Sequence, residues 1–452
     1  MRMPAHPGAE AMAVSTLNTL SATQMAAKIA SGTATCEQVA RACIERIEAR
    51  EPAVKAWSYL DSERILAEAR RLDRQKDHGP LHGVPVGVKD IIDTCDMPTE
   101  MGSPIYKGYR PAADASCVAL LRAAGAVILG KTVTCEFAGA TPAATTNPYD
   151  VRRTPGGSSS GSAAAVADFM VPLAFGTQTG GSVQRPASFC GIVGYKPTFG
   201  LINTAGVKPA AVSLDTIGLM ARTVQDIELA MRPLTNSAPV AWLQPDARIR
   251  VGVCRYAWDF AQDETKHAVD DAANRLASQG IAVRDVILPS LYDGLPESRE
   301  VVNDYERARG MAYEWQRHRA EISKGLANTI ERGLTISRDR YIGANRYLEQ
   351  CRHKFSELIA DFDVLLSLTV AGEAPMGLAS TGDHRFQSIW TQLRVPAVTL
   401  PTHAGPNGMP VGIQLVADAH GDSHLLAVAE LIFRKLGRGP VVGITAPAAA
   451  RV

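Results

Sequence analysis

Short apolar runs alternate with helical segments along much of the chain, and this alternation limits the possible folds more than any other feature. Residues 84–89 form an apolar run bounded by glycines, which predicts a buried strand that ends at Lys89. Residues 114–124 have the pattern of a capped helix, Gly125 ends it, and residues 126–129 are typical of another buried strand. Strands that alternate with helices in this way predict a parallel sheet covered by helices.

The second half of the chain repeats this alternation. It follows residues 231–247, which contain three prolines without clear periodicity and which we expect to form a linker or excursion. The expected elements are then strand 249–254, helix 264–279, strand 281–288, helices within 301–358, and strands 363–369, 395–400 and 411–416. Residues 16–73, by contrast, have apolar residues at helical spacing.

The composition argues against several classes of protein. Lysine and arginine number 47 against 46 aspartates and glutamates, so the net charge of +1 creates no global field that would attract nucleic acid or an anionic membrane. No stretch reaches the roughly 18 apolar residues of a membrane span, and residues 1–32 lack the layout of a signal peptide, so we expect a cytoplasmic protein. The eight cysteines form no C-x-x-C pair and no histidine lies at metal-ligand spacing to them, so neither disulfides nor a metal site is expected.

Two glycine-containing motifs match known chemistry only by letter. Residues 125–132 fit G-x-x-x-x-G-K-[ST], the phosphate-binding loop, but 126–129 are an apolar strand where that loop needs outward backbone amides. Residues 157–161 fit G-x-S-x-G, the nucleophile elbow, but the polar, proline-interrupted stretch before them does not make a central strand. A flexible linker is the alternative for this Gly/Ser run, yet linkers do not lead directly into an alanine-rich helix.

Three other segments together suit one chemical task. They are Lys89 at a strand end, the Gly/Ser run at 156–161, and residues 176–182. Hydrolysis of an amide through a serine ester needs a nucleophile, a base that accepts its proton, and backbone N–H groups directed at the oxyanion. Gly180 and Gly181 would let the backbone approach the substrate. A buried lysine can be the base because desolvation lowers its pKa, and a second serine could relay the proton.

At this point the sequence resembles the amidase signature family, serine hydrolases that use a Ser-Ser-Lys triad. The resemblance rests on residues 87–90, 155–161, 180–182, 191–198 and 408–414, so it covers nearly the whole chain. By motif position it implies Ser182 as the nucleophile, Ser158 as a relay serine preceded by a cis peptide bond, and Lys89 as the base. The interval of 24 residues between the two serines matches the family's interval.

The resemblance also implies an oxyanion hole formed by the backbone amides of Thr179, Gly180, Gly181 and Ser182. Two positions depart from the commonest family pattern, because Gln178 and Gln184 stand where an aspartate and an arginine are usual. Neutral contacts would then replace an ion pair. The nearest likeness within the family is to malonamidase-type amidases, in which the arginine at the position of Arg185 faces a substrate carboxylate. We take Arg185 and Gln178 as candidate substrate-binding residues, with the alternative that Arg185 binds only protein groups.

We therefore expect an α/β enzyme whose mixed, mostly parallel central sheet is sandwiched by helices, with a helical N-terminal extension at 1–75 and one catalytic domain at 76–452. The expected activity is hydrolysis of linear C–N bonds of small carboxamides through a seryl acyl-enzyme, without cofactor or metal. Carbamates, aryl amides and esters are alternative substrates, and a glutaminase-type amidotransferase subunit is a less favoured alternative. The expected partners are a small-molecule acyl substrate and a second copy of the chain in a homodimer, with no nucleic acid and no membrane.

Overall fold

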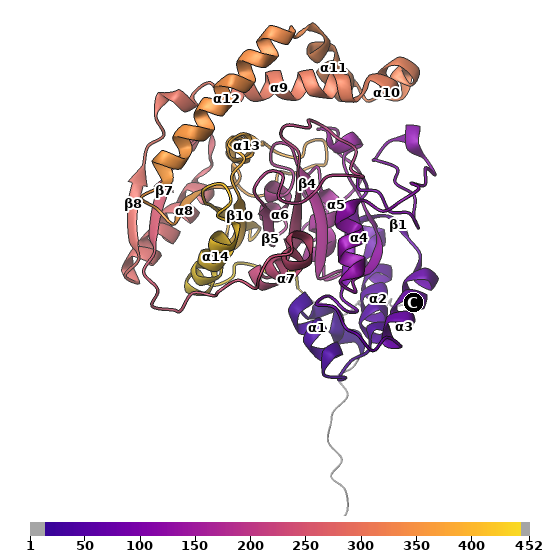
Figure 1. Cartoon of the computed structure of the whole chain (residues 1–452). Coiled ribbons are helices and arrows are strands. Elements are labelled where there is room, and N and C mark those ends of the chain that lie inside the picture. The colour runs from indigo at the N-terminus through magenta and orange to yellow at the C-terminus, as the bar shows by residue number, and fades with distance from the viewer. Residues whose placement is uncertain (1–13, 444–452) are drawn as a thin grey trace, which may run out of the picture.

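Strands from both halves of the chain join one eleven-stranded sheet in the computed structural model, which describes residues 14–443 (Figure 1). The strands lie in the order β1-β3-β2-β4-β6-β5-β10-β11-β9-β7-β8. Their bounds are β1 Trp57–Leu60, β2 Pro85–Lys89, β3 Val127–Thr132, β4 Leu173–Gln178, β5 Val193–Lys196, β6 Thr216–Ala221, β7 Arg250–Cys254, β8 Ala282–Val286, β9 Val364–Leu368, β10 Ala397–Ala404 and β11 Pro410–Val416. The expected α/β fold with a central sheet between helices is confirmed.

Helices cover both faces of the sheet, because successive strand residues point to opposite sides. On β3, Ile128 joins an apolar cluster with α4, α7 and α14, whereas Val127 and Leu129 join another with α2 and α5. The α-helices are α1 Ala22–Ala30, α2 Cys36–Val54, α3 Ser62–Asp73, α4 Ser116–Ala123, α5 Ser160–Ala167, α6 Gln184–Phe189, α7 Val224–Thr235, α8 Asp263–Ser278, α9 Leu295–Gly310, α10 Ala312–Arg317, α11 Lys324–Thr335, α12 Arg338–Ile359, α13 Arg385–Gln392 and α14 Asp422–Leu436.

The strand directions differ in one respect from the expectation. Four neighbouring pairs are parallel and six are antiparallel, so the sheet is mixed as expected but its parallel pairs are the minority. Parallel pairing occurs where a helix connects the strands, as α4 does between β2 and β3 and α8 between β7 and β8. Short connections give antiparallel pairs instead, and β10 and β11 are joined through the expected turn at Asn407-Gly408.

The N-terminal segment and the expected linker both differ in detail from the expectation. Strand β1 lies within the first 75 residues and pairs with β3, so this segment contributes an edge strand as well as helices. Helix α7 extends to Thr235 with Pro233 inside it, so the irregular connection begins only after that helix. The division at 1–75 and 76–452 stays a prediction, as does a cytoplasmic location. Within residues 14–443, no helix has the length and apolarity that a membrane crossing requires.

The two motifs set aside above have other structures. Residues 127–132 are the buried strand β3, and Lys131 Nζ donates to Ile92 O at 2.7 Å and to Thr99 Oγ1 at 2.5 Å. This lysine therefore faces protein oxygens and lies outside any loop that could enclose a phosphate. No strand occurs among residues 139–159, so the Gly/Ser run is not the strand-to-helix turn of a nucleophile elbow.

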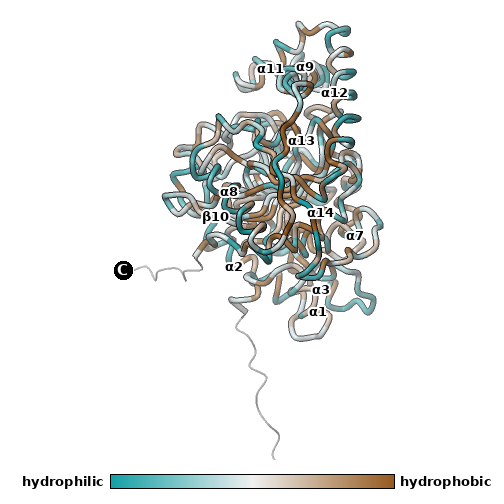
Figure 2. Tube along the Cα trace, turned by 90° about the vertical axis from the view of Figure 1, so that its left-hand side faces the viewer, coloured by the Kyte–Doolittle hydropathy of each residue, from teal (hydrophilic) through white to brown (hydrophobic). Residues whose placement is uncertain are grey.

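Helices α9 to α12 form a group beyond one end of the sheet, and Figures 1 and 2 show this arrangement from two directions. Helix α9 contacts α11, α12 and α13, and α13 lies between this group and the strands. Phe355 of α12 and Trp390 of α13 are buried with ring centroids 5.9 Å apart. The helical group is thus anchored by an apolar core of its own over the sheet end where β2 and β4 terminate.

Candidate active site

Two neighbouring parallel strands, β2 and β4, end at the same edge of the sheet and bring the first site residues together. Lys89 is the last residue of β2, and its side chain is completely buried. Its Nζ donates to Ser158 Oγ at 2.8 Å and to Thr177 Oγ1 of β4 at 2.7 Å. No carboxylate of the described residues lies within ion-pair distance, so the lysine is surrounded by neutral oxygens.

This environment favours the neutral form of the lysine. Burial lowers the pKa of Lys89 from 10.5 to about 7, and the charge of Arg307 acts in the same direction. Cys135 and Asp215 oppose the shift but do not cancel it. A lysine with this pKa exchanges its proton near neutral pH, which is the range in which a general base works best.

Ser158 lies in a tight turn that neighbouring segments hold in place. The peptide bond that precedes it, Gly157–Ser158, is cis. The Ser158 carbonyl accepts a hydrogen bond from Cys135 N at 3.1 Å, and Ser159 Oγ accepts one from Thr177 N at 3.2 Å. Ser159 N donates to the carbonyl of Ser182 at 3.3 Å, so the turn is tied both to the end of β4 and to the loop of the second serine.

The loop after β4 carries Ser182 and the four amides expected to form the oxyanion hole. Among the described residues, no protein acceptor receives a hydrogen bond from the N–H groups at 179–182. A side chain at Gly181 would overlap the amide of Gln387, with its Cβ 2.8 Å from Cδ, so only glycine fits there. Ser182 is 9% exposed and lines a cavity. Free amides beside an accessible hydroxyl are the arrangement that stabilises a tetrahedral oxyanion.

One link of the expected proton relay is not a hydrogen bond in this structure. No such bond joins Ser158 Oγ and Ser182 Oγ within residues 14–443. Catalytic hydrogen bonds are often long or poorly aligned without substrate and shorten in the reacting complex. The geometry therefore connects Lys89 to Ser158 directly, and connects Ser158 to Ser182 only through the contact between their loops.

Gln178 and Gln184, the two departures from the family pattern, contact each other. Gln178 Nε2 donates to Gln184 Oε1 at 3.0 Å and to Thr391 Oγ1 at 3.1 Å. Its Oε1 accepts from the backbone N–H groups of Val183 at 2.9 Å and Gln184 at 3.1 Å. Neutral hydrogen bonds thus occupy the place of an ion pair. The completely buried Gln178 amide is engaged at both ends and supports the loop of Ser182, outside the cavity wall.

Arg185 lies in α6 and lines the cavity that contains Ser182. Its Nη2 donates to Gly157 O at 2.6 Å and to Thr381 Oγ1 at 3.1 Å, whereas Nε and Nη1 are buried without a partner. Burial lowers the pKa of Arg185 to about 10, so the guanidinium remains charged at neutral pH. Arg185 therefore binds protein groups through one nitrogen and keeps two free donors.

The structure adds polar contacts that no motif indicated. Thr177 is the second acceptor for Lys89, and Thr179 Oγ1 donates to Asp215 Oδ1 at 2.6 Å. The other oxygen of this carboxylate accepts from the backbone N–H groups of Ala210 and Ala211 at 2.7 and 3.0 Å. Burial raises the pKa of Asp215. These contacts fix the loop that carries the oxyanion amides, and they come from segments far apart in the chain.

The cavity beside Ser182 has a volume of about 640 Å³. The loop at 179–182 forms part of its wall, and the remainder comes from α9, α11 and residues 379–384. Its charged side chains are those of Arg185, Arg299, Glu300, Asp304, Arg307 and Arg332. The sequence predicted helices in this region but indicated no role for them in the site.

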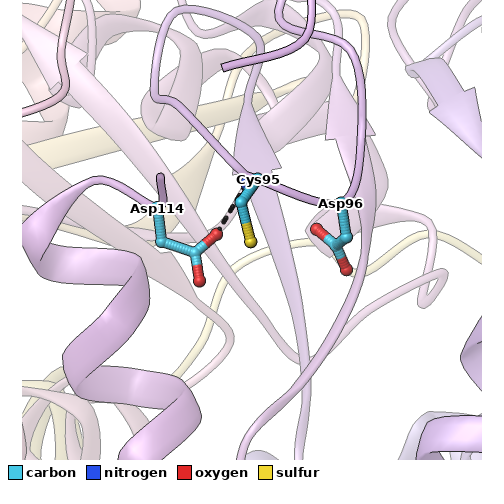
Figure 3. A group of neighbouring side chains, drawn as sticks. All are labelled: Cys95, Asp96 and Asp114. Carbon is cyan, nitrogen blue, oxygen red and sulfur yellow. Dashed lines mark hydrogen bonds between the residues drawn. The ribbon is translucent and has the colours of Figure 1, made fainter. Parts of the chain in front are cut away.

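A group of potential metal ligands lies elsewhere, formed by Cys95, Asp96 and Asp114 (Figure 3). Cys95 N donates to Asp114 Oδ1 at 2.8 Å, and Cys95 is exposed whereas the other seven cysteines are buried. Asp96 forms ion pairs with Arg64 at 2.9 Å and with Arg122 at 2.7 Å, and Arg122 also pairs with Asp114 at 3.0 Å. Because arginines already neutralise both carboxylates, this group needs no cation to explain it.

Comparisons with known proteins agree with this geometry. A family model described as Amidase matches residues 38–426. The A chain of the glutamyl-tRNA(Gln) amidotransferase of Oleidesulfovibrio alaskensis, one of that enzyme's subunits, is 32% identical over 480 residues, covering 93% of this chain and 98% of that protein. A crystal structure of an amidase has a TM-score of 0.84 at 29% identity, with 92% of this chain and 100% of that chain covered. The complex of 6-aminohexanoate cyclic dimer hydrolase with substrate has a TM-score of 0.83 at 26% identity, with 94% and 100% covered.

These relatives overturn the expectation about partners. We expected only a small-molecule substrate and a second copy of the chain, and we excluded nucleic acid from the net charge of +1. That expectation is wrong, because proteins similar over nine tenths of the chain bear the name of one subunit of an enzyme whose name includes a tRNA. Net charge is an average over the whole surface, and it excludes neither a local contact nor a partner that holds the nucleic acid.

The match to the family model includes the segments of Lys89, Ser158 and Ser182, and the relatives match nearly end to end. Their names describe enzymes that act on amide C–N bonds. The chain therefore belongs to the amidase signature family, and it is an enzyme that hydrolyses C–N bonds.

Proposed function

We propose that the chain hydrolyses a carboxamide by acyl transfer to Ser182, with Lys89 as the base and Ser158 as the proton relay. The observation that carries the proposal is the completely buried Lys89, whose Nζ lies 2.8 Å from Ser158 Oγ and has no carboxylate partner among the described residues. A structural lysine in a protein interior is usually ion-paired, whereas an unpaired one favours the neutral form that can accept a proton.

In the first stage, neutral Lys89 accepts the proton of Ser158 while Ser158 accepts that of Ser182, whose oxygen attacks the carbonyl carbon. The backbone amides at 179–182 stabilise the oxyanion. The proton on Lys89 then returns through Ser158 to the leaving nitrogen, the C–N bond breaks, and the amine departs. In the second stage, water loses its proton along the same route and attacks the ester, which releases the acid and restores Ser182.

The residues around the triad have supporting roles in this proposal. Gln178 positions the loop of Ser182, because both ends of its amide are bonded to protein groups. Arg185 fixes the turn before Ser158 through the Gly157 carbonyl and contributes free donors to the cavity. A substrate contact of Arg185 stays a prediction.

Small carboxamides are the first substrates to test, and carbamates, aryl amides and esters follow, because the same acyl-transfer groups can act on each. The range of amides named among the structural relatives supports a broad test. One is a hydrolase of the cyclic dimer of 6-aminohexanoate. Another is a peptide amidase of Stenotrophomonas maltophilia, with a TM-score of 0.79 at 25% identity over 94% of this chain and 99% of that chain.

A second candidate function is that of an amidotransferase component that releases ammonia from glutamine for a tRNA-linked acceptor. The observation that favours it is the 32% identity to one subunit of such an enzyme over nearly all of both chains. In this function the chain would act together with other protein subunits. Gln178 and Gln184, which replace the usual aspartate and arginine, weigh against it.

The decisive experiment measures ammonia, amine or alcohol release by the purified chain from glutamine, malonamate, an aliphatic carboxamide, an aryl anilide, a carbamate and an aryl ester. Ser182→Ala should abolish turnover without changing the melting temperature, whereas Ser160→Ala, at the start of α5, should leave turnover unchanged. Preference for glutamine together with co-purification of further proteins would select the second candidate. Full activity of Ser182→Ala would show that the nucleophile is assigned wrongly.

A further inference from the structure

Arg299 of α9 extends to the oxyanion loop although it is 117 residues from Ser182 in sequence. Its Nη2 lies 3.1 Å from the position that a Cβ on Gly180 would occupy, and Arg299 and Ser182 line the same cavity. The guanidinium is therefore adjacent to the reacting centre. Figure 1 shows how α9 crosses the end of the sheet and makes this contact possible.

The charge of Arg299 is not compensated by the protein. Among the described residues it forms no ion pair and no hydrogen bond, and its Nε is buried without a partner. Arg332 in the same cavity differs, because its Nε lies 2.8 Å from Asp304 Oδ2. Glu300 also lines the cavity but lies beyond ion-pair distance of Arg299. An arginine without a carboxylate in a partly enclosed site is costly unless something else supplies the anion.

A second unpaired cation strengthens this imbalance. Arg185 is 4% exposed, lines the cavity, and has Nε and Nη1 free of partners. His384 lies close to both arginines, and their charges, with burial, lower its pKa to about 2, so this ring is neutral and supplies no anion. Two guanidinium groups that repel each other beside an active serine would both be stabilised by one bound carboxylate, whose two oxygens match the planar fork of arginine.

We propose that Arg299 is a specificity-determining residue that, together with Arg185, forms a carboxylate-binding subsite next to Ser182, so that the enzyme prefers amides that carry a carboxylate. This inference rests on the proposed amidase function and names its substrate class. The carboxylate would lie beside the oxyanion loop, so the amide and the acid are separated by a short carbon chain. Glutamine and other ω-amides of short dicarboxylic acids meet this description.

The test compares kcat/KM for two substrates of equal length, the half-amide of glutaric acid and neutral pentanamide, in the wild type and in Arg299→Gln. The loss of a hydrogen bond to a charged group should reduce kcat/KM for the half-amide by about 10- to 100-fold and leave pentanamide within about twofold. Arg299→Lys should restore part of the preference. Arg340→Gln, an exposed arginine of α12 that pairs with Glu297, is the matched control and should change neither value.

Each outcome bears on a distinct claim. Equal losses for both substrates, or a wild type without preference for the half-amide, would overturn the subsite while leaving the amidase function intact. If the wild type hydrolyses neither substrate, binding of glutarate to the wild type and to Arg299→Gln decides the matter by calorimetry. Heat of binding that is equal in the two proteins, or absent from both, would refute the subsite. Failure of every amide in the larger panel would instead refute the proposed function.

Discussion

Replacing Thr177 by valine should lower the pH at which the enzyme becomes active. Thr177 Oγ1 accepts a hydrogen bond from Lys89 Nζ at 2.7 Å, in a site where the lysine has no carboxylate partner within the described chain. An ammonium group donates more strongly than a neutral amine, so this oxygen stabilises the charged lysine. Valine keeps the shape of threonine but removes the acceptor. The pKa of Lys89 should therefore fall below its present value of about 7.

The magnitude follows from the energy of one hydrogen bond. A hydrogen bond to a charged group contributes roughly 1.5–3 kcal/mol, and about 1.4 kcal/mol corresponds to one pKa unit. Ser158 Oγ remains as an acceptor at 2.8 Å and compensates part of the loss, so we expect a shift of about one unit. At pH 6 the neutral fraction of Lys89 would then rise from about one tenth to about one half, a fivefold gain relative to the plateau.

The assay is kcat/KM between pH 5 and 9 at constant ionic strength, because this quantity reports the pKa values of the free enzyme. Activity should rise with pH in both proteins, with the midpoint near 7 in the wild type and near 6 in Thr177→Val. Thr399→Val is the matched control, since the buried Thr399 Oγ1 has no hydrogen-bond partner to lose. A midpoint that stays in place, moves upward, or moves equally in the control would refute the reasoning.

Three further substitutions test the energetics of the fold and site by thermal unfolding. Lys89→Met should be more stable than the wild type by up to about 4 kcal/mol at pH 7, because the folded pKa of about 7 lies below the unfolded value and wild-type stability falls as pH drops from about 10 to 7; no gain at pH 7, or an equal gain at pH 10, would contradict this. Gly181→Ala should lower both activity and melting temperature, because its Cβ would overlap Gln387, whereas Gly343→Ala, with open space in α12, should be neutral or stabilising by up to about 1 kcal/mol; similar effects of the two would argue against crowding. Asp168→Asn should lower the free energy of unfolding by about 3 kcal/mol, because it leaves two arginines of α2 without their buried partner; an unchanged unfolding free energy would show that the pair contributes little.

Local patterns were sufficient to predict most of the elements. Strand β2 ends at the expected Lys89, and the strands at 250–254 and 411–416 lie within a residue of their predicted ranges. Such runs are readable because a buried strand requires consecutive apolar residues and because glycine and proline end them. The relative directions of the strands were less predictable, since direction depends on the connections between strands that are distant in sequence.

The expected triad positions were also legible in the sequence. Lys89 follows an apolar strand, and the two serines lie in glycine-rich turns whose spacing matches a known family. Glycine-rich turns are conspicuous because the backbone must come close to other groups there, as at Gly181. The sequence alone did not show that Thr177 would share the lysine, because a threonine in a strand has no feature that separates a catalytic contact from an ordinary one.

The sequence by itself therefore determined the alternating elements, the family, and the residues proposed to react, because each depends on neighbours within a few positions or on a local motif. The tertiary structure decided what surrounds them. It placed Arg299 from a distant helix beside Gly180, removed Lys89 from every carboxylate of the described residues, and gave Gln178 a partner in Thr391. Burial and charge are sums over all groups within a few ångströms, whatever their separation along the chain, so the pKa of a base and the charge of a pocket exist only once the chain has folded.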